Sequence, residues 1–147
     1  DAAGNYELRN RQIEDVRLGK LRAVIVAAMK PVYLAQQNQS NKQLLDTLVN
    51  MAMDVGADSF IAQSIALRDR TDQSETLKNY YGSSLVLCGR EDNLCPPERH
   101  EKINALLSNS NLEIVEGAGH ISTLEAPSLV NSALKQWIKQ PLFNQNN

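Results

Sequence analysis

The sequence has few of the features that mark nucleic-acid-binding, membrane or secreted proteins. Its 147 residues include 15 basic and 17 acidic side chains, which gives a net charge of −2 and no basic block. Nucleic acid and anionic membranes are therefore not expected as main partners. No apolar run approaches the ~20 residues of a membrane span. The start of the chain also lacks the basic and apolar regions of a signal peptide, so we expect a cytoplasmic protein.

Cysteine and histidine are scarce, which limits disulfide and metal chemistry. Cys88 and Cys95 are the only cysteines, and their spacing fits neither a disulfide framework nor a zinc site. His100 and His120 show no ligand spacing with Asp92 or Cys95. We therefore expect two free thiols and no bound metal ion.

The glycines form no phosphate-binding loop. Gly117 and Gly119 follow a predicted strand, as in a dinucleotide fingerprint, but Ser122 stands at the third glycine position. The next helix is predicted to begin only near Pro127, too late for its N-terminus to face a pyrophosphate. We expect no nucleotide and no other cofactor.

The first 80 residues carry helical patterns and no strand. Residues 1–12 are polar and are predicted to be an irregular linker, and residues 13–29 have helical apolar spacing. A capping-box pattern at Ser40 opens another helix, which Gly56 is expected to end. Two shorter helices are predicted between there and Tyr80.

At Gly82 the pattern changes to strand, helix, strand, helix. Residues 84–88 are a short apolar run typical of a strand covered on both faces, and residues 112–116 are predicted to form a second strand. This order predicts an α/β fold with a right-handed parallel crossover. Because two parallel strands leave unpaired edges, we expect self-association or pairing with an amino-terminal half through an exposed strand edge.

Two residues able to transfer protons follow these two strands. Asp92 comes just after the first strand and His120 just after the second. Since the carboxyl ends of parallel strands line the ligand crevice, the two side chains are expected to meet there. A histidine held by a carboxylate can deprotonate a hydroxyl nucleophile. A structural role for His120, or Cys95 as its nucleophile, stays open.

Both loops resemble the carboxyl-terminal part of proteins with the α/β-hydrolase fold. The stretch LVLCGREDNLCPP is similar to the family pattern G-x-x-D-x-x-x-P. The stretch GAGHISTLEAP is similar to G-x-G-H-x-x-x-x-E-x-P. Residues 60–77 also resemble the end of the helical cap that such enzymes insert before the first of these strands, and the resemblance covers most of the chain from about Ile13. The matching positions are Gly89, Asp92, Pro96, Gly117, Gly119, His120, Glu125 and Pro127.

The resemblance implies a serine hydrolase that cleaves ester or related acyl bonds. Asp92 would be the triad acid and His120 the general base. Glu91 lies off the family spacing and is expected to be solvated, whereas Glu125 and Pro127 are expected to shape the final helix. The nucleophile motif G-x-S-x-G is absent from the sequence, so we expect a chain that is inactive alone and part of an enzyme for a small ester-like substrate.

The resemblance also implies domain boundaries. Residues 1–12 would be a linker after a core strand, residues 13–80 the helical cap, residues 82–140 the carboxyl-terminal part of the core, and residues 141–147 a flexible tail. Two other functions stay open: a lyase or C–C bond hydrolase of the same fold, and a non-catalytic binding or assembly module.

Overall fold

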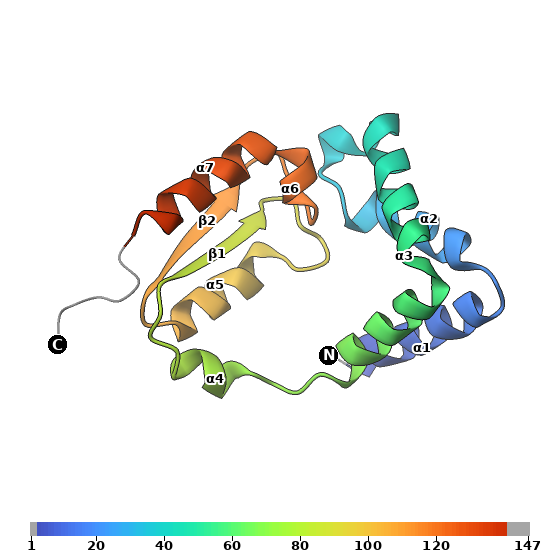
Figure 1. Ribbon diagram of the computed structural model, residues 1–147, viewed down its shortest axis with the longest axis horizontal. Coiled ribbons are helices and arrows are strands. Elements are labelled where there is room, and N and C mark those ends of the chain that lie inside the picture. Colours follow the sequence, from blue (N-terminus) through green and yellow to red (C-terminus); the bar gives the residue numbers. More distant parts are fainter. Residues whose placement is uncertain (1–2, 141–147) are drawn as a thin grey trace. The chain divides into compact units, whose positions relative to one another are not determined.

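The computed structural model describes residues 3–140, with side chains for residues 6–27 and 33–140. The chain divides into two compact units, whose helices and strands are labelled in Figure 1. The first unit comprises residues 1–30 and 40–71, and the second comprises residues 31–39 and 72–147. The tail predicted for residues 141–147 lies outside the described residues.

The first unit is helical. Its elements are α1 (Ala3–Arg17), α2 (Leu21–Val32, whose last residues belong to the second unit) and α3 (Lys42–Asp69). Apolar side chains from all three helices are buried: Ile13, Val16, Leu21, Ile25, Leu48 and Val49. No helix in the described part of the chain is long and apolar enough to cross a membrane.

The prediction of an irregular linker over residues 1–12 is wrong, because α1 begins at Ala3. Contacts with a distant helix support this polar segment. The guanidinium of Arg68 in α3 donates a hydrogen bond to Asn10 at 2.7 Å and lies 5.0 Å from the centre of the Tyr6 ring. Asn10 and Arg68 are 58 residues apart in the sequence, so no local pattern could have revealed this contact.

Three helix boundaries differ from those predicted. Gly19, at φ +81°, separates α1 from α2 where one helix was predicted. Gly56, at φ +83°, kinks α3 but does not end it. The N-cap of α3 is Asn41, whose side chain accepts a hydrogen bond from the Leu44 N–H at 3.1 Å, and not Ser40.

The second unit is the predicted α/β arrangement. Its strands β1 (Ser84–Gly89) and β2 (Ser110–Val115) are parallel, with Ser84 opposite Ser110 and Gly89 opposite Val115. Helices α5 (Pro97–Leu106) and α7 (Pro127–Ile138) lie on opposite sides of the two strands (Figure 1). Three shorter helices complete this unit: η1 (Gln36–Asn38), α4 (Ser74–Lys78) and α6 (Ser122–Glu125).

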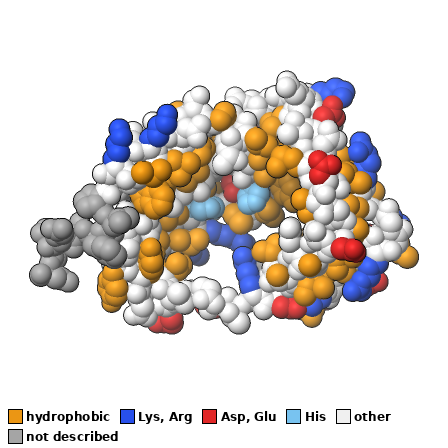
Figure 2. Space-filling view, viewed as in Figure 1, with side chains coloured by type: hydrophobic (Ala, Val, Ile, Leu, Met, Phe, Trp, Pro, Cys, Tyr) orange, Lys and Arg blue, Asp and Glu red, His pale blue; other side chains and the backbone are white. Residues whose placement is uncertain are grey.

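The core of the second unit lies where the strands end. Val115, Ala118 and Val130 form a buried cluster against which Leu87 packs. In Figure 2, hydrophobic side chains gather over the strands and α5 of this unit. Gly89 closes β1 against the loop after β2, since a Cβ atom there would lie 2.2 Å from the Ala118 carbonyl oxygen. The ends of both strands are therefore held in direct backbone contact.

Candidate functional site

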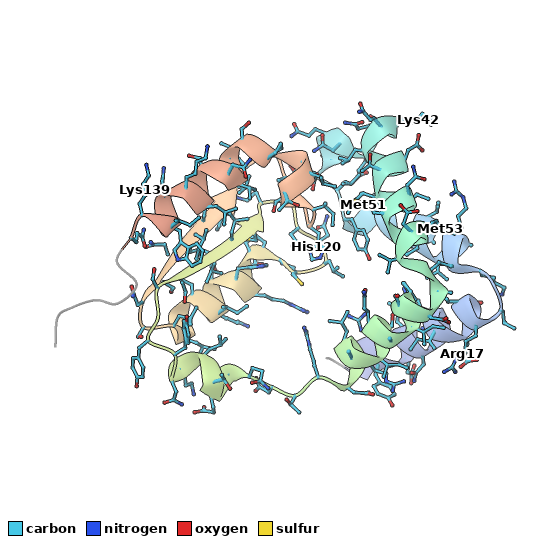
Figure 3. All side chains as sticks on the ribbon, in the orientation of Figure 1. Arg17, Lys42, Met51, Met53, His120 and Lys139 are labelled. Carbon is cyan, nitrogen blue, oxygen red and sulfur yellow. The ribbon has the colours of Figure 1, made fainter. Side chains whose placement is uncertain are left out.

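Asp92 and His120 meet just beyond the ends of the strands, as the sequence predicts. Asp92 follows β1, and its N–H donates to the Gly89 carbonyl oxygen at 3.3 Å. His120 follows β2, and Figure 3 shows it at this end of the strands. Nδ1 of His120 lies 2.9 Å from Oδ2 of Asp92. One hydrogen bond thus joins the two loops.

The carboxylate of Asp92 is buried and held by the backbone of its own loop. Only 5% of the residue is exposed. Its Oδ1 accepts hydrogen bonds from the N–H of Leu94 at 2.9 Å and of Cys95 at 2.8 Å. These bonds fix the orientation of the carboxylate, so that Oδ2 faces His120. Hydrogen bonds within the Asp92 loop therefore suffice to orient this carboxylate toward His120.

The imidazole of His120 is oriented by this carboxylate. An ionised carboxylate can only accept hydrogen bonds, so the proton of the neutral ring lies on Nδ1 and the lone pair on Nε2. The side chain is 32% exposed, and no hydrogen bond joins Nε2 to another described residue. The Tyr33 ring lies beside the imidazole, with 5.7 Å between ring centres. Nε2 is therefore the ring nitrogen left to accept a hydrogen bond.

The two glutamates near this pair both accept hydrogen bonds from backbone N–H groups. Glu91 is half-buried, and its Oε2 accepts the N–H of Gln36 at 2.8 Å in a hydrogen bond that is exposed to solvent. Glu125 was expected to shape the final helix; it lies at the end of α6, and its carboxylate accepts hydrogen bonds from the N–H groups of Gly119 and Ala35. Pro127 does open α7, where it occupies the first turn.

The segment of residues 33–39, hereafter the 33–39 segment, lies between α2 and α3. It belongs to the second unit. Leu34 and Ala35 within it are 0% exposed. The Tyr33 carbonyl oxygen accepts the His120 N–H at 2.8 Å. Its partners lie 55 to 90 residues away, from Glu91 for Gln36 to Glu125 for Ala35, so no local pattern could have revealed them.

The cysteines take no direct part in the pair. Cys88 is buried in β1, and burial together with the negative charge of Asp92 raises the pKa of its thiol. Cys95 contributes its backbone N–H to Asp92, and neither cysteine forms a disulfide in the described chain. His100 is in α5, where Nδ1 lies 3.3 Å from the Pro96 carbonyl oxygen. Among the described residues, no group of three or more His, Cys, Asp or Glu side chains is placed to hold a metal ion.

Neither a protein-family model nor a curated protein sequence matches the chain. Solved structures do match. An esterase from Thermogutta terrifontis is 24% identical at a TM-score of 0.87, over 95% of this chain and 51% of that one. An α/β-hydrolase from a Medee basin deep-sea metagenome library is 17% identical at a TM-score of 0.80, over 99% and 55%. The enol-lactonase from Burkholderia xenovorans is 15% identical at a TM-score of 0.78, over 91% and 51%.

The chain thus spans about half the length of each of these structures. At these identities the likeness speaks for the fold. The parallel strands, the covering helices and the loops after both strands agree with it. The chain therefore has the α/β-hydrolase fold, over a part consistent with the carboxyl-terminal half of such proteins.

Proposed function

We propose that this chain supplies the acid and the general base of a serine hydrolase that cleaves an ester or related acyl bond. The observation that carries the proposal is the 2.9 Å hydrogen bond between Asp92 Oδ2 and His120 Nδ1. A buried carboxylate on one ring nitrogen leaves the other nitrogen free to accept a proton. The likeness to an esterase and an enol-lactonase supports acyl transfer as the reaction.

In this proposal His120 Nε2 removes the proton from a serine hydroxyl as that oxygen attacks the acyl carbon. Asp92 keeps the ring in the required tautomer and stabilises the imidazolium that forms. His120 then returns the proton to the leaving alcohol, and in the second half of the reaction it takes a proton from water, which attacks the acyl-serine, and gives that proton back to the serine oxygen as the acid leaves. The sequence holds no G-x-S-x-G motif, so the nucleophile would come from residues outside it. Because triad residues act as a unit, the 147-residue chain alone is proposed to be inactive.

The open edge of β1 is where we propose that the nucleophile-bearing part docks. Among the described residues, β1 pairs with β2 and with no other strand. A hollow of about 510 Å³ lies beside β1, lined mainly by apolar side chains that include Leu77, Leu85, Leu87, Ile103 and Leu107. A parallel strand with an open edge and uncovered apolar neighbours favours the addition of another strand. Self-association through the same edge is the competing outcome.

A chimera tests this proposal. The part of the Thermogutta terrifontis esterase that this chain does not cover would be fused to the 147 residues, and hydrolysis of p-nitrophenyl acetate would be measured. We expect turnover by the chimera and none by the chain alone. His120→Ala should lower turnover by about 10³-fold or more, and Asp92→Asn by about 10⁴-fold because it favours the wrong tautomer.

Lys102→Ala is the control, since Lys102 is exposed on α5 and is not among the residues that line the hollow beside β1, so this change should leave turnover largely unchanged. Turnover that is indifferent to His120→Ala would refute the assigned role. Ester hydrolysis by the chain alone that depends on His120 would refute its inactivity. A non-catalytic binding module would be favoured by two results together: the chimera folds but is inactive, and light scattering shows that the 147-residue chain is a stable monomer. Cleavage of C–C bonds but not esters would favour a lyase or C–C hydrolase.

A further inference from the structure

The 33–39 segment is hydrogen-bonded to both loops of the site. The Tyr33 carbonyl oxygen accepts the His120 N–H at 2.8 Å. The side-chain amide of Gln37 donates to the Gly117 carbonyl oxygen at 2.7 Å, in the loop that leads to His120. On the other side, the bond of Gln36 to Glu91 reaches the loop that carries Asp92. This segment is therefore part of the architecture of the site.

Glu125 connects this segment to the histidine loop. Its Oε1 accepts the Gly119 N–H at 2.8 Å. Its Oε2 accepts the Ala35 N–H at 2.8 Å and the side-chain amide of Asn38 at 3.0 Å. Hydrogen bonds to an ionised carboxylate are stronger than neutral ones. One half-buried carboxylate thus holds three donors from two segments that are far apart in the sequence.

These bonds close a ring around the backbone of His120. The ring runs from Glu125 to Gly119, through the peptide to His120, across to Tyr33, along the chain to Ala35, and back to Glu125. Two consecutive backbone N–H groups are therefore held here: that of His120 by the Tyr33 carbonyl oxygen and that of Gly119 by Glu125. Its ring is also bounded by the Tyr33 ring.

We infer that Glu125 is a positioning residue for His120, acting by joining the histidine loop to the 33–39 segment. Without the carboxylate, the donors of Gly119, Ala35 and Asn38 lose their acceptor. The Tyr33 carbonyl oxygen is then no longer held where it accepts the His120 N–H. The imidazole would then leave the geometry that its bond to Asp92 requires. The catalytic consequence rests on the proposed function, whereas the effect on His120 itself does not.

Glu125→Gln tests the inference, because an amide offers one acceptor oxygen and places an NH₂ group among three donors. In the full 147-residue chain, NMR would follow amide exchange at His120 and the protonation of its ring nitrogens. We expect protection of the His120 N–H to fall about tenfold more than that of Arg90, because a hydrogen bond to a charged group is lost locally. We also expect the proton to be no longer confined to Nδ1.

The Arg90 N–H is a suitable reference, since it donates to the Val115 carbonyl oxygen at 2.9 Å in the same unit but outside the ring. Glu116→Gln is the matched control: Glu116 is an exposed carboxylate of the same unit that pairs with Arg90. It should leave the ring nitrogens of His120 unchanged. Equal loss of protection at His120 and Arg90 in Glu125→Gln, with the tautomer unchanged, would mean a merely structural role and would overturn the inference.

If Glu125→Gln does not fold, as judged by circular dichroism, Glu125→Asp carries the test, because it keeps the charge but shortens the side chain by one methylene, so that it no longer reaches both the Gly119 and the Ala35 N–H groups. A smaller change at His120 in the same direction would support the inference, and no change would overturn it. Both measurements are independent of ester hydrolysis. If the chimera is inactive but Glu125→Gln changes the amide protection and ring protonation of His120, only the proposed function is refuted. If the chimera is active but Glu125→Gln leaves both properties of His120 unchanged, only the positioning role is refuted.

Discussion

Gly119→Ala should damage the site more than the addition of one methyl group would suggest. A Cβ atom on Gly119 would lie 2.7 Å from the Ala35 nitrogen, 2.8 Å from the Tyr33 oxygen and 2.9 Å from the Leu34 carbonyl carbon. All three are backbone atoms of the 33–39 segment and cannot rotate away. The segment itself must therefore move.

The size of that movement sets the expected cost. Ordinary contact begins at 3.4 Å, so the Tyr33 oxygen would have to retreat by about 0.6 Å. The His120 N–H bond to this oxygen, now 2.8 Å, would then approach the limit of a hydrogen bond. Overpacking of this kind costs about 1–3 kcal/mol, and a weakened hydrogen bond adds about 1 kcal/mol. We expect the free energy of unfolding to fall by about 2–4 kcal/mol.

Urea unfolding followed by circular dichroism measures this loss, and Gly82→Ala is the control. A Cβ on Gly82 would lie 2.4 Å from the hydroxyl oxygen of Tyr80, a nominally closer contact. Tyr80 is 50% exposed, and its side chain can swing into solvent, so we expect a loss of less than about 1 kcal/mol. Equal losses in the two variants would refute the reasoning that the 33–39 segment is packed rigidly against Gly119.

Two further predictions concern α3 and β1. Asn41→Ala should lower the free energy of unfolding by about 1 kcal/mol, because it removes the N-cap of α3. Ser40→Ala should change it by less than about 0.5 kcal/mol. Urea unfolding midpoints in the reverse order would contradict Asn41 as the N-cap. Burial and the Asp92 charge raise the pKa of Cys88 above its ordinary value of 9.0, so the unfolded chain loses this proton at lower pH than the folded chain. The free energy of unfolding should therefore fall as pH rises past about 9, and Cys88→Ala should flatten that fall in guanidinium melts between pH 8 and pH 10; an unchanged slope would contradict it.

The parts of the fold that the sequence predicts well are those with local patterns. The apolar run at residues 84–88 predicts a strand, and the structure has β1 there, with Val86 and Cys88 buried on one face and Leu85 and Leu87 only partly buried on the other. The helix between the two strands makes them parallel, as observed. Asp92 and His120 come together because parallel strands end at the same edge, so their meeting follows from the topology and needs no further information.

The parts that escaped prediction depend on contacts between distant residues. The 33–39 segment is polar over most of its length, and its anchoring groups, such as Glu125, are about 90 residues away. Glu91 was judged by its place in a motif, whereas its partner is the backbone of Gln36, which any sequence would provide. The ordering of α1 likewise depends on Arg68. Such hydrogen bonds between distant residues have no signature in composition or periodicity.

The path of the chain between the two units affects how the protein can be divided. The chain passes from the first unit to the second at residue 31, returns at residue 40 and leaves again after residue 71. A piece that begins at residue 72 would contain Asp92 and His120 but would lack the Tyr33 oxygen that accepts the His120 N–H. Cutting between the units would thus separate the site from its own support. The bonds that complete it span 87 and 90 residues, so the site should assemble late in folding.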